Sequence, residues 1–393
     1  MSIDVFIVGG KRTAMGQYVG ALKDISAIDL GATAAKGALA ATGVAADEID
    51  HTIIGNALQT SGDAIYGARH VALKAGVPFD RPALTVNRLC GSGIQSIVSG
   101  AQMIQLEEAH TALVGGIESM SQAPHVIRGA RSGFPLGSGK MEDSLMVALL
   151  DTYCNTPMAG TAENLARKFE ITRDEQDQYA LRSQQEAKRA RDAGYFAEEI
   201  VPVEVKSRKG TSMFEQDDHL RPETTMEGLT KLKPAFAKDG FVTAGNASGI
   251  VDGAAALIIA DEDYVQKRGL KPMGRIVSWA YAGVEPEIMG IGPVPATRKA
   301  LEKAGLKLSD IDLIEVNEAF AAQYLSVEKE LDLDRSKTNV NGGAIALGHP
   351  LGATGTRLVL TLLHELHRRS GRYGLATACI GGGQGIAMIV ERV

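Results

Sequence analysis

Apolar runs that suit buried strands alternate with helical patterns along much of the chain. Residues 38–58, ALAATGVAADEIDHTIIGNAL, show the unit: a helical pattern that ends at Gly43, a short polar loop, then an apolar strand. Residues 111–119 (TALVGGIES) and 375–385 (LATACIGGGQG) contain further apolar strands, each of which ends in glycine. Strands that alternate with helices of this length predict an α/β fold in which helices cover the faces of a sheet.

A second copy of this unit follows in the C-terminal part of the chain. A shift of 262 residues places 38–58 on 300–320, ALEKAGLKLSDIDLIEVNEAF, and matches Ala38, Leu39, Gly43, Ile49, Asp50 and Ala57 to identical residues. Residues 84–93 likewise resemble 337–348, and helical patterns follow both, at 92–106 and 354–369. Two copies of a β-α-β-α-β unit account for this order, and chance similarity among βα units is the alternative.

Between the copies the composition changes. Residues 121–249 open with a Gly/Ser/Pro-rich stretch, continue with a charged helical pattern from Thr161 to about Ala193, and end in a polar run followed by glycines. The strand-like residues 254–260 then rejoin the first half. We predict three parts, listed by residue range: an N-terminal half of 1–120 plus 250–271, an inserted loop domain of 121–249, and a C-terminal half of 272–393.

Composition narrows the classes of function. The 393 residues are 45% hydrophobic, 22% charged and only 5% aromatic, with 45 glycines and a net charge of −6. These values exclude a disordered chain and a collagen, and they argue against nucleic acid as a partner. No apolar run reaches the roughly 18 residues of a membrane helix, so no membrane partner is expected. The first residues resemble no signal or transit peptide, and three scattered cysteines suit a reducing compartment, so we expect a cytoplasmic protein.

Cys90 and His349 are the first candidates for chemistry. Cys90 lies between a strand end and a helix start in VNRLCGSGIQSI, where backbone N–H groups and the helix dipole are expected to lower the pKa of an exposed thiol. A buried, inert cysteine is the alternative. His349 follows the equivalent turn of the second copy, so pseudo-twofold packing would bring it into the same cleft. A cysteine paired with a histidine is an activated nucleophile.

Two further segments end at the same predicted cleft. Cys379 opens the run CIGGGQG, whose backbone amides are free to donate to an oxyanion beside a second thiol that can move a proton. Asn317 ends a strand of the second half and would place an amide there. The run lacks a dinucleotide or P-loop pattern, and HELHRR (364–369) lacks the HExxH order, so we expect no metal and no permanently bound cofactor.

Taken together, the motifs resemble the thiolase family along essentially the whole chain. They are listed in chain order: NRLCGSGIQS, GGIESMSQAPH, TAGNASGIVDGAAA, NEAFA, NVNGGAIALGHPLGATG and CIGGGQG. LQTSGDAIYGARHV, PMAGTAENLA and MGIGPVPA are most similar to 3-ketoacyl-CoA thiolases of the mitochondrial fatty-acid-oxidation type. The resemblance implies a thiolase fold, in which two duplicated αβαβα layered halves carry an inserted loop domain.

The resemblance also implies a role for each candidate residue. Cys90 would carry the acyl group as a thioester, and His349 would activate it and help hold the substrate thioester oxygen beside a water positioned by Asn317. Cys379 would exchange the proton at the carbon where the C–C bond breaks. The backbone N–H groups of Cys90 and Gly381 would form a second oxyanion hole. Claisen chemistry needs both an acyl carrier and a stabilised enolate, so two thiols with separate tasks suit it.

Coenzyme A and acyl-CoA are the implied substrates. By similarity, the residues that would line the coenzyme A tunnel are Leu149, Met158, Arg221, Phe236, Ala244, Ser248, Ala319 and Phe320, with Arg221 at the nucleotide end. The family further implies a homodimer or homotetramer. Thiolases specialised for acetoacetyl-CoA typically carry His-Met where this chain has Pro157-Met158, which favours the broader 3-ketoacyl type. Acetoacetyl-CoA synthesis and a non-catalytic acyl-CoA carrier remain the alternatives.

Overall fold

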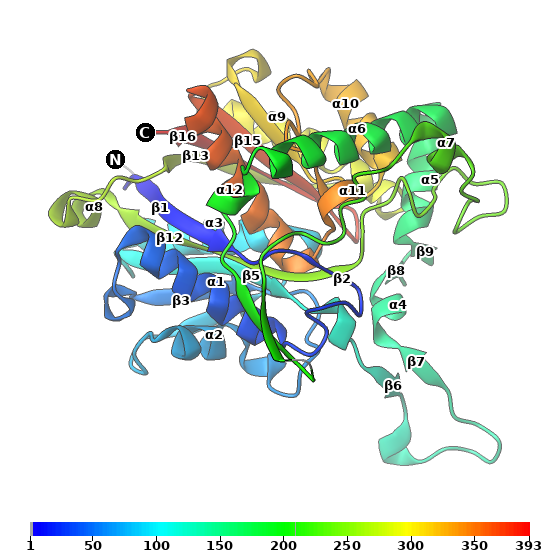
Figure 1. Ribbon diagram of the computed structural model, residues 1–393, viewed down its shortest axis with the longest axis horizontal. Coiled ribbons are helices and arrows are strands. Elements are labelled where there is room, and N and C mark those ends of the chain that lie inside the picture. Colours follow the sequence, from blue (N-terminus) through cyan, green and yellow to red (C-terminus); the bar gives the residue numbers. More distant parts are fainter. Residues whose placement is uncertain (1–2, 209) are drawn as a thin grey trace.

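The computed structural model describes residues 3–208 and 210–393, and its main feature is one ten-stranded mixed sheet (Figure 1). The strand order is β14-β15-β16-β13-β1-β12-β5-β3-β4, with β2 paired to β12 beside this path. The strands of the first half are β1 (Val5–Arg12), β2 (Gly16–Gln17), β3 (His51–Gly55), β4 (Ala83–Val86), β5 (Thr111–Glu118) and β12 (Val251–Asp261). Those of the second are β13 (Gly274–Gly283), β14 (Leu313–Val316), β15 (Tyr373–Ile380) and β16 (Gln384–Arg392).

The pairing pattern repeats in the two halves of the sheet. In the first half β3 is parallel to β5, β5 is antiparallel to β12, and β12 is antiparallel to β1. In the second half β14, β15, β16 and β13 repeat these three relations in the same order. The two half-sheets are joined where β1 pairs with β13, through the residue pairs Phe6 with Arg275 and Ile7 with Gly274. The duplication expected from the sequence is therefore present in the sheet topology.

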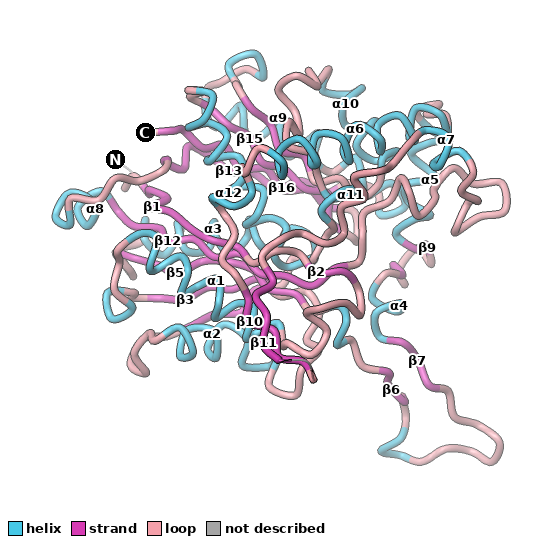
Figure 2. Tube along the Cα trace, viewed as in Figure 1, coloured by secondary structure: helices cyan, strands magenta, loops and turns pink. Residues whose placement is uncertain are grey.

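Helices cover the sheet in layers (Figure 2). One apolar cluster joins the first half-sheet to α1 (Ala27–Thr42) and α2 (Gly67–Ala75), and another joins the second to α9 (Pro293–Ala304) and α10 (Ala321–Leu331). The third and central cluster contains α3 (Ser92–Gln105) and α12 (Leu351–Arg369) with strands of both halves. This arrangement confirms the layered α/β fold.

The two central helices touch backbone to backbone. A Cβ atom on Gly93 of α3 would lie 2.4 Å from the backbone nitrogen of Thr356, and one on Gly355 of α12 would lie 2.4 Å from that of Ile94. Only glycine permits this approach, because any side chain would push the helices apart. The contact lies in the first turns of both helices, so the segments that lead into them also meet.

The chain leaves the sheet after β5 and returns at β12, and the intervening residues form several short strands and helices together with one long helix. They are β6 (His125–Ile127), β7 (Met141–Asp143), α4 (Ser144–Ala148), β8 (Leu150–Asp151), β9 (Thr156–Pro157), α5 (Met158–Lys168), α6 (Arg173–Asp192), β10 (Val203–Ser207), β11 (Gly210–Phe214) and α7 (Met226–Thr230). The hairpin of β6 and β7 projects away from the body (Figure 1). Two further short helices are α8 (Glu262–Arg268) and α11 (Ala344–Leu347). The exact boundaries of the three parts stay a prediction.

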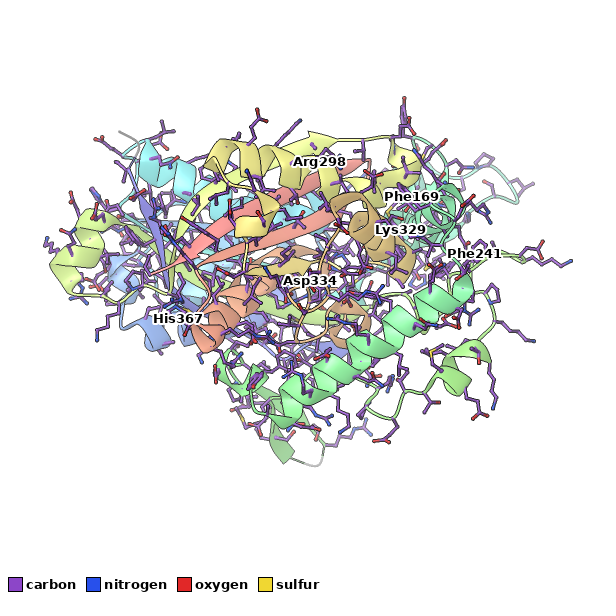
Figure 3. The ribbon with its side chains drawn as sticks, turned by 90° about the horizontal axis from the view of Figure 1, so that it is seen from above. Phe169, Phe241, Arg298, Lys329, Asp334 and His367 are labelled. Atoms are coloured by element: carbon purple, nitrogen blue, oxygen red, sulfur yellow. The ribbon has the colours of Figure 1, made fainter. Side chains whose placement is uncertain are left out.

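The single helical pattern expected from Thr161 to about Ala193 is wrong, because two helices cover it. The first ends at Lys168, and Lys329 of α10 donates a 3.1 Å hydrogen bond to the carbonyl of Phe169 just beyond that end (Figure 3). The second begins after Thr172, whose side chain forms a reciprocal capping box with Glu175. A capping box satisfies the first N–H groups of a new helix, so it favours a break over a continuous helix. None of the described helices is long and apolar enough to cross a membrane.

Candidate active site

A cavity of about 400 Å³ opens where the two halves meet the inserted segment. Its lining is mostly apolar, as expected for a pocket that receives an acyl chain or a pantetheine arm. Nine of the residues predicted from the sequence line it: Cys90, Leu149, Met158, Phe236, Ser248, Ala319, Phe320, His349 and Gly381. The cavity thus joins side chains from both copies of the duplicated unit.

Cys90 lies on a tight turn that leads directly into α3. The preceding residue, Leu89, has a φ of +46°, which is a strained backbone conformation for leucine. The thiol is buried, and burial raises the pKa of Cys90 to about 11, although the backbone N–H groups of Gly381 and of Cys90 itself act to lower it. The expectation of an exposed thiol with a lowered pKa is therefore wrong, because the loss of water outweighs two backbone donors.

His349 lies two residues before α12 and is also buried. Its Nδ1 is 2.6 Å from the hydroxyl oxygen of Thr354, and that hydroxyl donates its own proton to the carbonyl of Pro350 at 3.0 Å. Because the threonine has one proton and has already donated it, Nδ1 of the histidine must carry the hydrogen. The lone pair is then on Nε2, and burial lowers the pKa of His349 to about 3. The ring is a neutral base.

Asn317 lies immediately after β14 and is fully buried beside the histidine. Its Nδ2 is 3.3 Å from Nε2 of His349, so the amide donates to the ring nitrogen that carries the lone pair. Its backbone N–H donates to the carbonyl of Thr377, which ties it to β15 at 2.9 Å. Its Oδ1 makes no hydrogen bond to the other described residues and is available to a polar group in the site.

Cys379 lies near the end of β15, behind the cavity wall, where it packs against Met289 and Ala319. Burial raises the pKa of Cys379 well above its ordinary value, and the charge of a Cys90 thiolate would raise it further. The second cause means that the two sulfur atoms are close enough to interact. Cys379 is therefore a thiol that keeps its proton at neutral pH beside Cys90.

Two of the residues proposed for the coenzyme A tunnel lie outside the cavity. Arg221 is exposed, and its Nη2 donates a 2.8 Å hydrogen bond to the side chain of Gln17. Ala244 is exposed as well. Sequence reasoning also missed Thr354, which determines the histidine tautomer. The available signal was a hydroxyl residue at the start of a helical pattern, five positions after the histidine.

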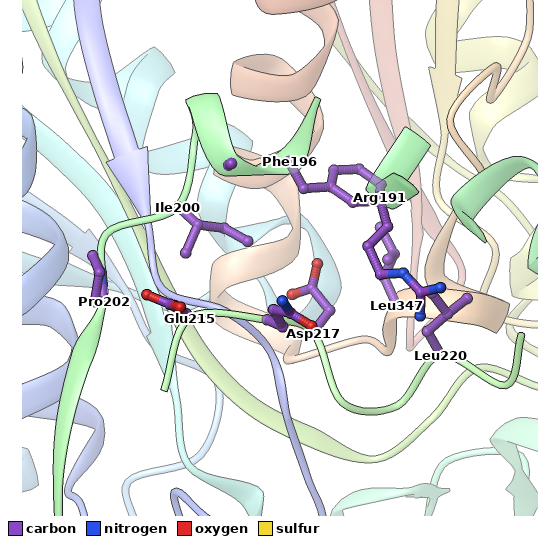
Figure 4. Close-up of a pocket in the computed structure, with 10 residues that line it drawn as sticks. Arg191, Phe196, Ile200, Pro202, Glu215, Asp217, Leu220 and Leu347 are labelled. Atoms are coloured by element: carbon purple, nitrogen blue, oxygen red, sulfur yellow. The ribbon is translucent and has the colours of Figure 1, made fainter. Parts of the chain in front are cut away.

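A second cavity of about 280 Å³ borders Leu347, two residues before the histidine (Figure 4). Arg191, Glu215 and Asp217 face it together with apolar side chains. The carboxylate of Asp217 is already paired within the protein, since both of its oxygens accept hydrogen bonds from the buried Arg12, at 2.7 and 2.9 Å. We therefore place the chemistry in the first cavity, which holds the cysteine and the histidine.

Comparison with known proteins shows which family the sequence matches. The N-terminal thiolase domain matches residues 5–263 and the C-terminal thiolase domain matches residues 270–392. The chain belongs to the thiolase family. It is 60% identical over 388 residues to the mitochondrial 3-ketoacyl-CoA thiolase of Homo sapiens, covering 98% of each protein. It is 50% identical over 390 residues to an acetyl-CoA acetyltransferase of Rhizobium meliloti, covering 99% of each.

The solved structures agree with the family. The crystal structure of human mitochondrial 3-ketoacyl-CoA thiolase in complex with CoA is similar to this thiolase with a TM-score of 0.97 and 58% identity. The match covers 100% of this chain and 98% of the human one. The thiolase fold expected from the motifs is therefore confirmed over the whole chain.

The cytoplasmic location expected from the start of the chain is contradicted. The human relative and those of Pongo abelii, Bos taurus, Mus musculus and Rattus norvegicus are all named mitochondrial, at 56% to 60% identity. The lack of an Arg- and Ser-rich opening was thus no guide to the compartment.

Proposed function

We propose that this thiolase cleaves 3-ketoacyl-CoA with CoA to give acetyl-CoA and an acyl-CoA shortened by two carbons, reversibly. The observation that carries the proposal is that Cys90 and His349 line one apolar cavity, with Asn317 hydrogen-bonded to His349 and Cys379 packed behind the cavity wall, close enough to Cys90 to interact with it. A thiol that can carry the acyl group, a neutral imidazole that can take its proton and a second thiol that keeps a proton for the enolate are the groups that a Claisen cleavage uses. The relatives named 3-ketoacyl-CoA thiolase support the same reaction.

The first half-reaction breaks the C–C bond. Nε2 of His349 takes the proton of Cys90, and the thiolate attacks the 3-keto carbon of the substrate. The bond between C2 and C3 then breaks, its electron pair forms the enolate of acetyl-CoA, and the acyl group stays on Cys90 as a thioester. Cys379 donates its proton to the enolate carbon, acetyl-CoA leaves, and Cys379 becomes a thiolate.

The second half-reaction restores the enzyme. CoA gives its thiol proton to the Cys379 thiolate, and the CoA sulfur attacks the acyl-Cys90 thioester. Shortened acyl-CoA leaves, and the Cys90 thiolate recovers its proton from the imidazolium of His349. Every proton that left a residue returns to it, so the cycle needs no metal, oxidant or reductant.

Two groups of donors would stabilise the oxygen atoms that gain charge. The backbone N–H groups of Cys90 and Gly381 both face the sulfur of Cys90, so they suit the oxygen of the attacked carbonyl. Protonated Nε2 of His349 suits the thioester oxygen of the enolate. Asn317, with a free Oδ1 toward the site, would hold a water molecule against the same oxygen.

CoA would enter along the remaining lining residues. Leu149 and Phe236 supply apolar contact, with Leu149 packed in the same cluster as Cys90, while Met158, Ala319 and Phe320 lie toward Cys379. The related crystal structure with CoA supports CoA as the second substrate. Arg221 and Ala244 are outside the cavity, so in this proposal they contact only the nucleotide end of CoA. No permanently bound cofactor is proposed.

The preferred length of the substrate's acyl chain distinguishes this proposal from acetoacetyl-CoA synthesis. That alternative stays a candidate because one relative, at 50% identity, is named an acetyl-CoA acetyltransferase. Pro157 lines the cavity where short-chain thiolases typically carry histidine, and the remaining lining is apolar. We expect kcat/KM for six- to ten-carbon 3-ketoacyl-CoA to exceed that for acetoacetyl-CoA by at least about 10-fold, since each buried methylene contributes roughly 0.8 kcal/mol and the shortest of these substrates adds two. Initial rates of thiolysis across a substrate series measure this. A clear preference for acetoacetyl-CoA would favour the alternative.

We further propose a homodimer or homotetramer. Strand β4 is a free edge of the sheet, with Leu84 and the neighbouring Phe79 exposed, and such an edge readily pairs with a second copy. The projecting β6–β7 hairpin carries the exposed apolar residues Ile127, Phe134 and Leu136, which suit a second contact between copies.

Replacing residues 129–139 of the hairpin by a short Gly-Ser turn is expected to reduce the mass in solution by half without loss of thiolysis per subunit. The reason is that the hairpin lies outside the cavity and contacts only neighbouring copies in this proposal. Sedimentation velocity measures the mass, and Leu84→Lys serves as the companion variant for the β4 contact. Unchanged mass in both variants would contradict the assembly.

A further inference from the structure

Glu118, the last residue of β5, is a fully buried carboxylate that the mechanism above does not use. Its two oxygens accept four hydrogen bonds, all from uncharged N–H groups. Oε1 accepts from Asn56 Nδ2 at 2.8 Å and from the backbone of Leu58 at 3.0 Å. Oε2 accepts from the backbone of Ala57 at 3.2 Å and from that of Gly352 at 2.8 Å. A buried carboxylate without a cation is costly, so an arrangement of this kind calls for an explanation.

The donor from Gly352 places this carboxylate against the catalytic region. Gly352 belongs to the first turn of α12, whose N–H groups have no partner within the helix. The same turn includes Thr354, which holds Nδ1 of His349. The carboxylate therefore connects β5 of the first half to the helix that orients the histidine of the second half.

The surrounding backbone allows little movement of this turn. A Cβ atom on Gly116 would lie 1.8 Å from the carbonyl oxygen of Gly352, and one on Gly352 would lie 2.5 Å from that of Ile117. The start of α12 thus rests directly on the end of β5. A small rotation of the helix start would separate the histidine from Cys90, because the two residues come from different halves of the chain.

We propose that Glu118 is a positioning residue for acyl transfer: its carboxylate fastens the first turn of α12 to the end of β5 and so holds His349 in line with Cys90. The inference rests on the proposed thiolase function. Its charge does not supply the benefit, since burial raises the pKa of Glu118 to about 7, and the charged form raises the pKa of Cys90 and so opposes the thiolate. The geometry of the four donors is what Glu118 contributes.

Glu118→Gln is the test, because an amide group would turn N–H against at least one of the backbone donors. At saturating acetyl-CoA, we expect the single-turnover rate of Cys90 acetylation to fall about 10- to 100-fold, as expected for a displaced catalytic group. KM for acetyl-CoA should change less than about 3-fold, because Glu118 does not line the cavity. Nitrogen chemical shifts of the His349 ring should show loss of the single Nδ1–H tautomer.

Glu163→Gln is the matched control. Glu163 is 2% exposed and accepts hydrogen bonds from the backbone N–H groups of Phe241 and Val242, and none of its hydrogen bonds within the described residues goes to α12. We expect this variant to lose as much thermal stability as Glu118→Gln and to keep the acetylation rate. Equal loss of rate in both variants, or a normal rate in folded Glu118→Gln, would overturn the proposal.

A second variant keeps the test decisive if Glu118→Gln does not fold. Asn56→Ala removes one of the four donors and leaves the carboxylate in place, so we expect a loss of about 3- to 10-fold in the acetylation rate with KM unchanged. A wild-type rate in folded Asn56→Ala would then overturn the inference. The proposed function fails separately, because it requires the wild-type protein itself to form the acetyl adduct.

Discussion

Cys90→Ala is expected to abolish formation of the acetyl adduct and to lower thiolysis by at least about 10³-fold, which corresponds to roughly 4 kcal/mol of barrier. The reason is that alanine offers no sulfur to carry the acyl group, and neither the buried Cys379 nor a water molecule can replace a covalent carrier. Intact-mass measurement after mixing with acetyl-CoA reports the adduct, and thiolysis of 3-ketoacyl-CoA reports the rate.

The third cysteine provides the control for this experiment. Cys154 is only partly buried and does not line the cavity, so Cys154→Ala should keep both the adduct and the rate. A wild-type amount of adduct in Cys90→Ala would contradict the assignment of the nucleophile. Loss of the adduct in Cys154→Ala with Cys90 intact would contradict it equally.

Cys379→Ala is expected to separate the two half-reactions. Acetylation of Cys90 should persist at a reduced rate, because a departing CoA thiolate is a stable leaving group that can leave without the proton that Cys379 would otherwise donate to it. C–C cleavage should fall about 10²- to 10⁴-fold, because carbanion chemistry depends on a positioned acid or base. Cys379 suits this role, since burial raises its pKa and keeps its proton in place until an enolate is present.

Two measurements distinguish this outcome from general damage. The first is the acetyl adduct by intact mass, which should match the wild-type amount. The second is exchange of the acetyl-CoA methyl protons with deuterated water, followed by NMR, which should be lost. A variant that still exchanges these protons would remove Cys379 from the acid–base role, and a variant without the adduct would show that its effect is not confined to C–C chemistry.

Both experiments depend on the burial of reactive groups. The two thiols have pKa values above neutrality and the imidazole has one below it, so the resting site carries no charge. A neutral resting site can receive an apolar acyl chain without expelling tightly held water. The charged pair of thiolate and imidazolium then forms only when a substrate carbonyl is present to accept the attack.

Local patterns in the sequence were sufficient to predict the layered α/β fold. The shift that matched Gly43 to Gly305 located two equivalent helix ends, and both adopt the left-handed conformation that favours glycine. The apolar strands and the helical patterns at 92–106 and 354–369 are present within a few residues. The prediction for the inserted segment was less accurate. The periodicity alone indicated one continuous helix, but a capping box at Thr172 and Glu175 begins a second helix there.

The four residues proposed for the reaction could also be predicted from the sequence, because each follows a strand or precedes a helix within a recognisable motif. The protonation states of these residues could not be predicted from the sequence. The pKa of Cys90 depends on how much water the whole fold excludes, and the tautomer of His349 depends on one threonine hydroxyl. The exposed positions of Arg221 and Ala244, outside the cavity, could not be predicted from the sequence either.

The sequence by itself determined the duplicated α/β halves and the family, because these follow from local periodicity and short motifs, and the family resemblance supplied the proposed nucleophile, base and proton donor. Only the tertiary structure decided that the thiols are buried with raised pKa values, that Nε2 of His349 holds the lone pair, and that Glu118 fastens α12 to β5. The physical reason is that the burial of a thiol and the contact between β5 and α12 depend on residues distant in the chain, while the tautomer of His349 depends on which way the nearby Thr354 hydroxyl donates, which only the folded turn fixes.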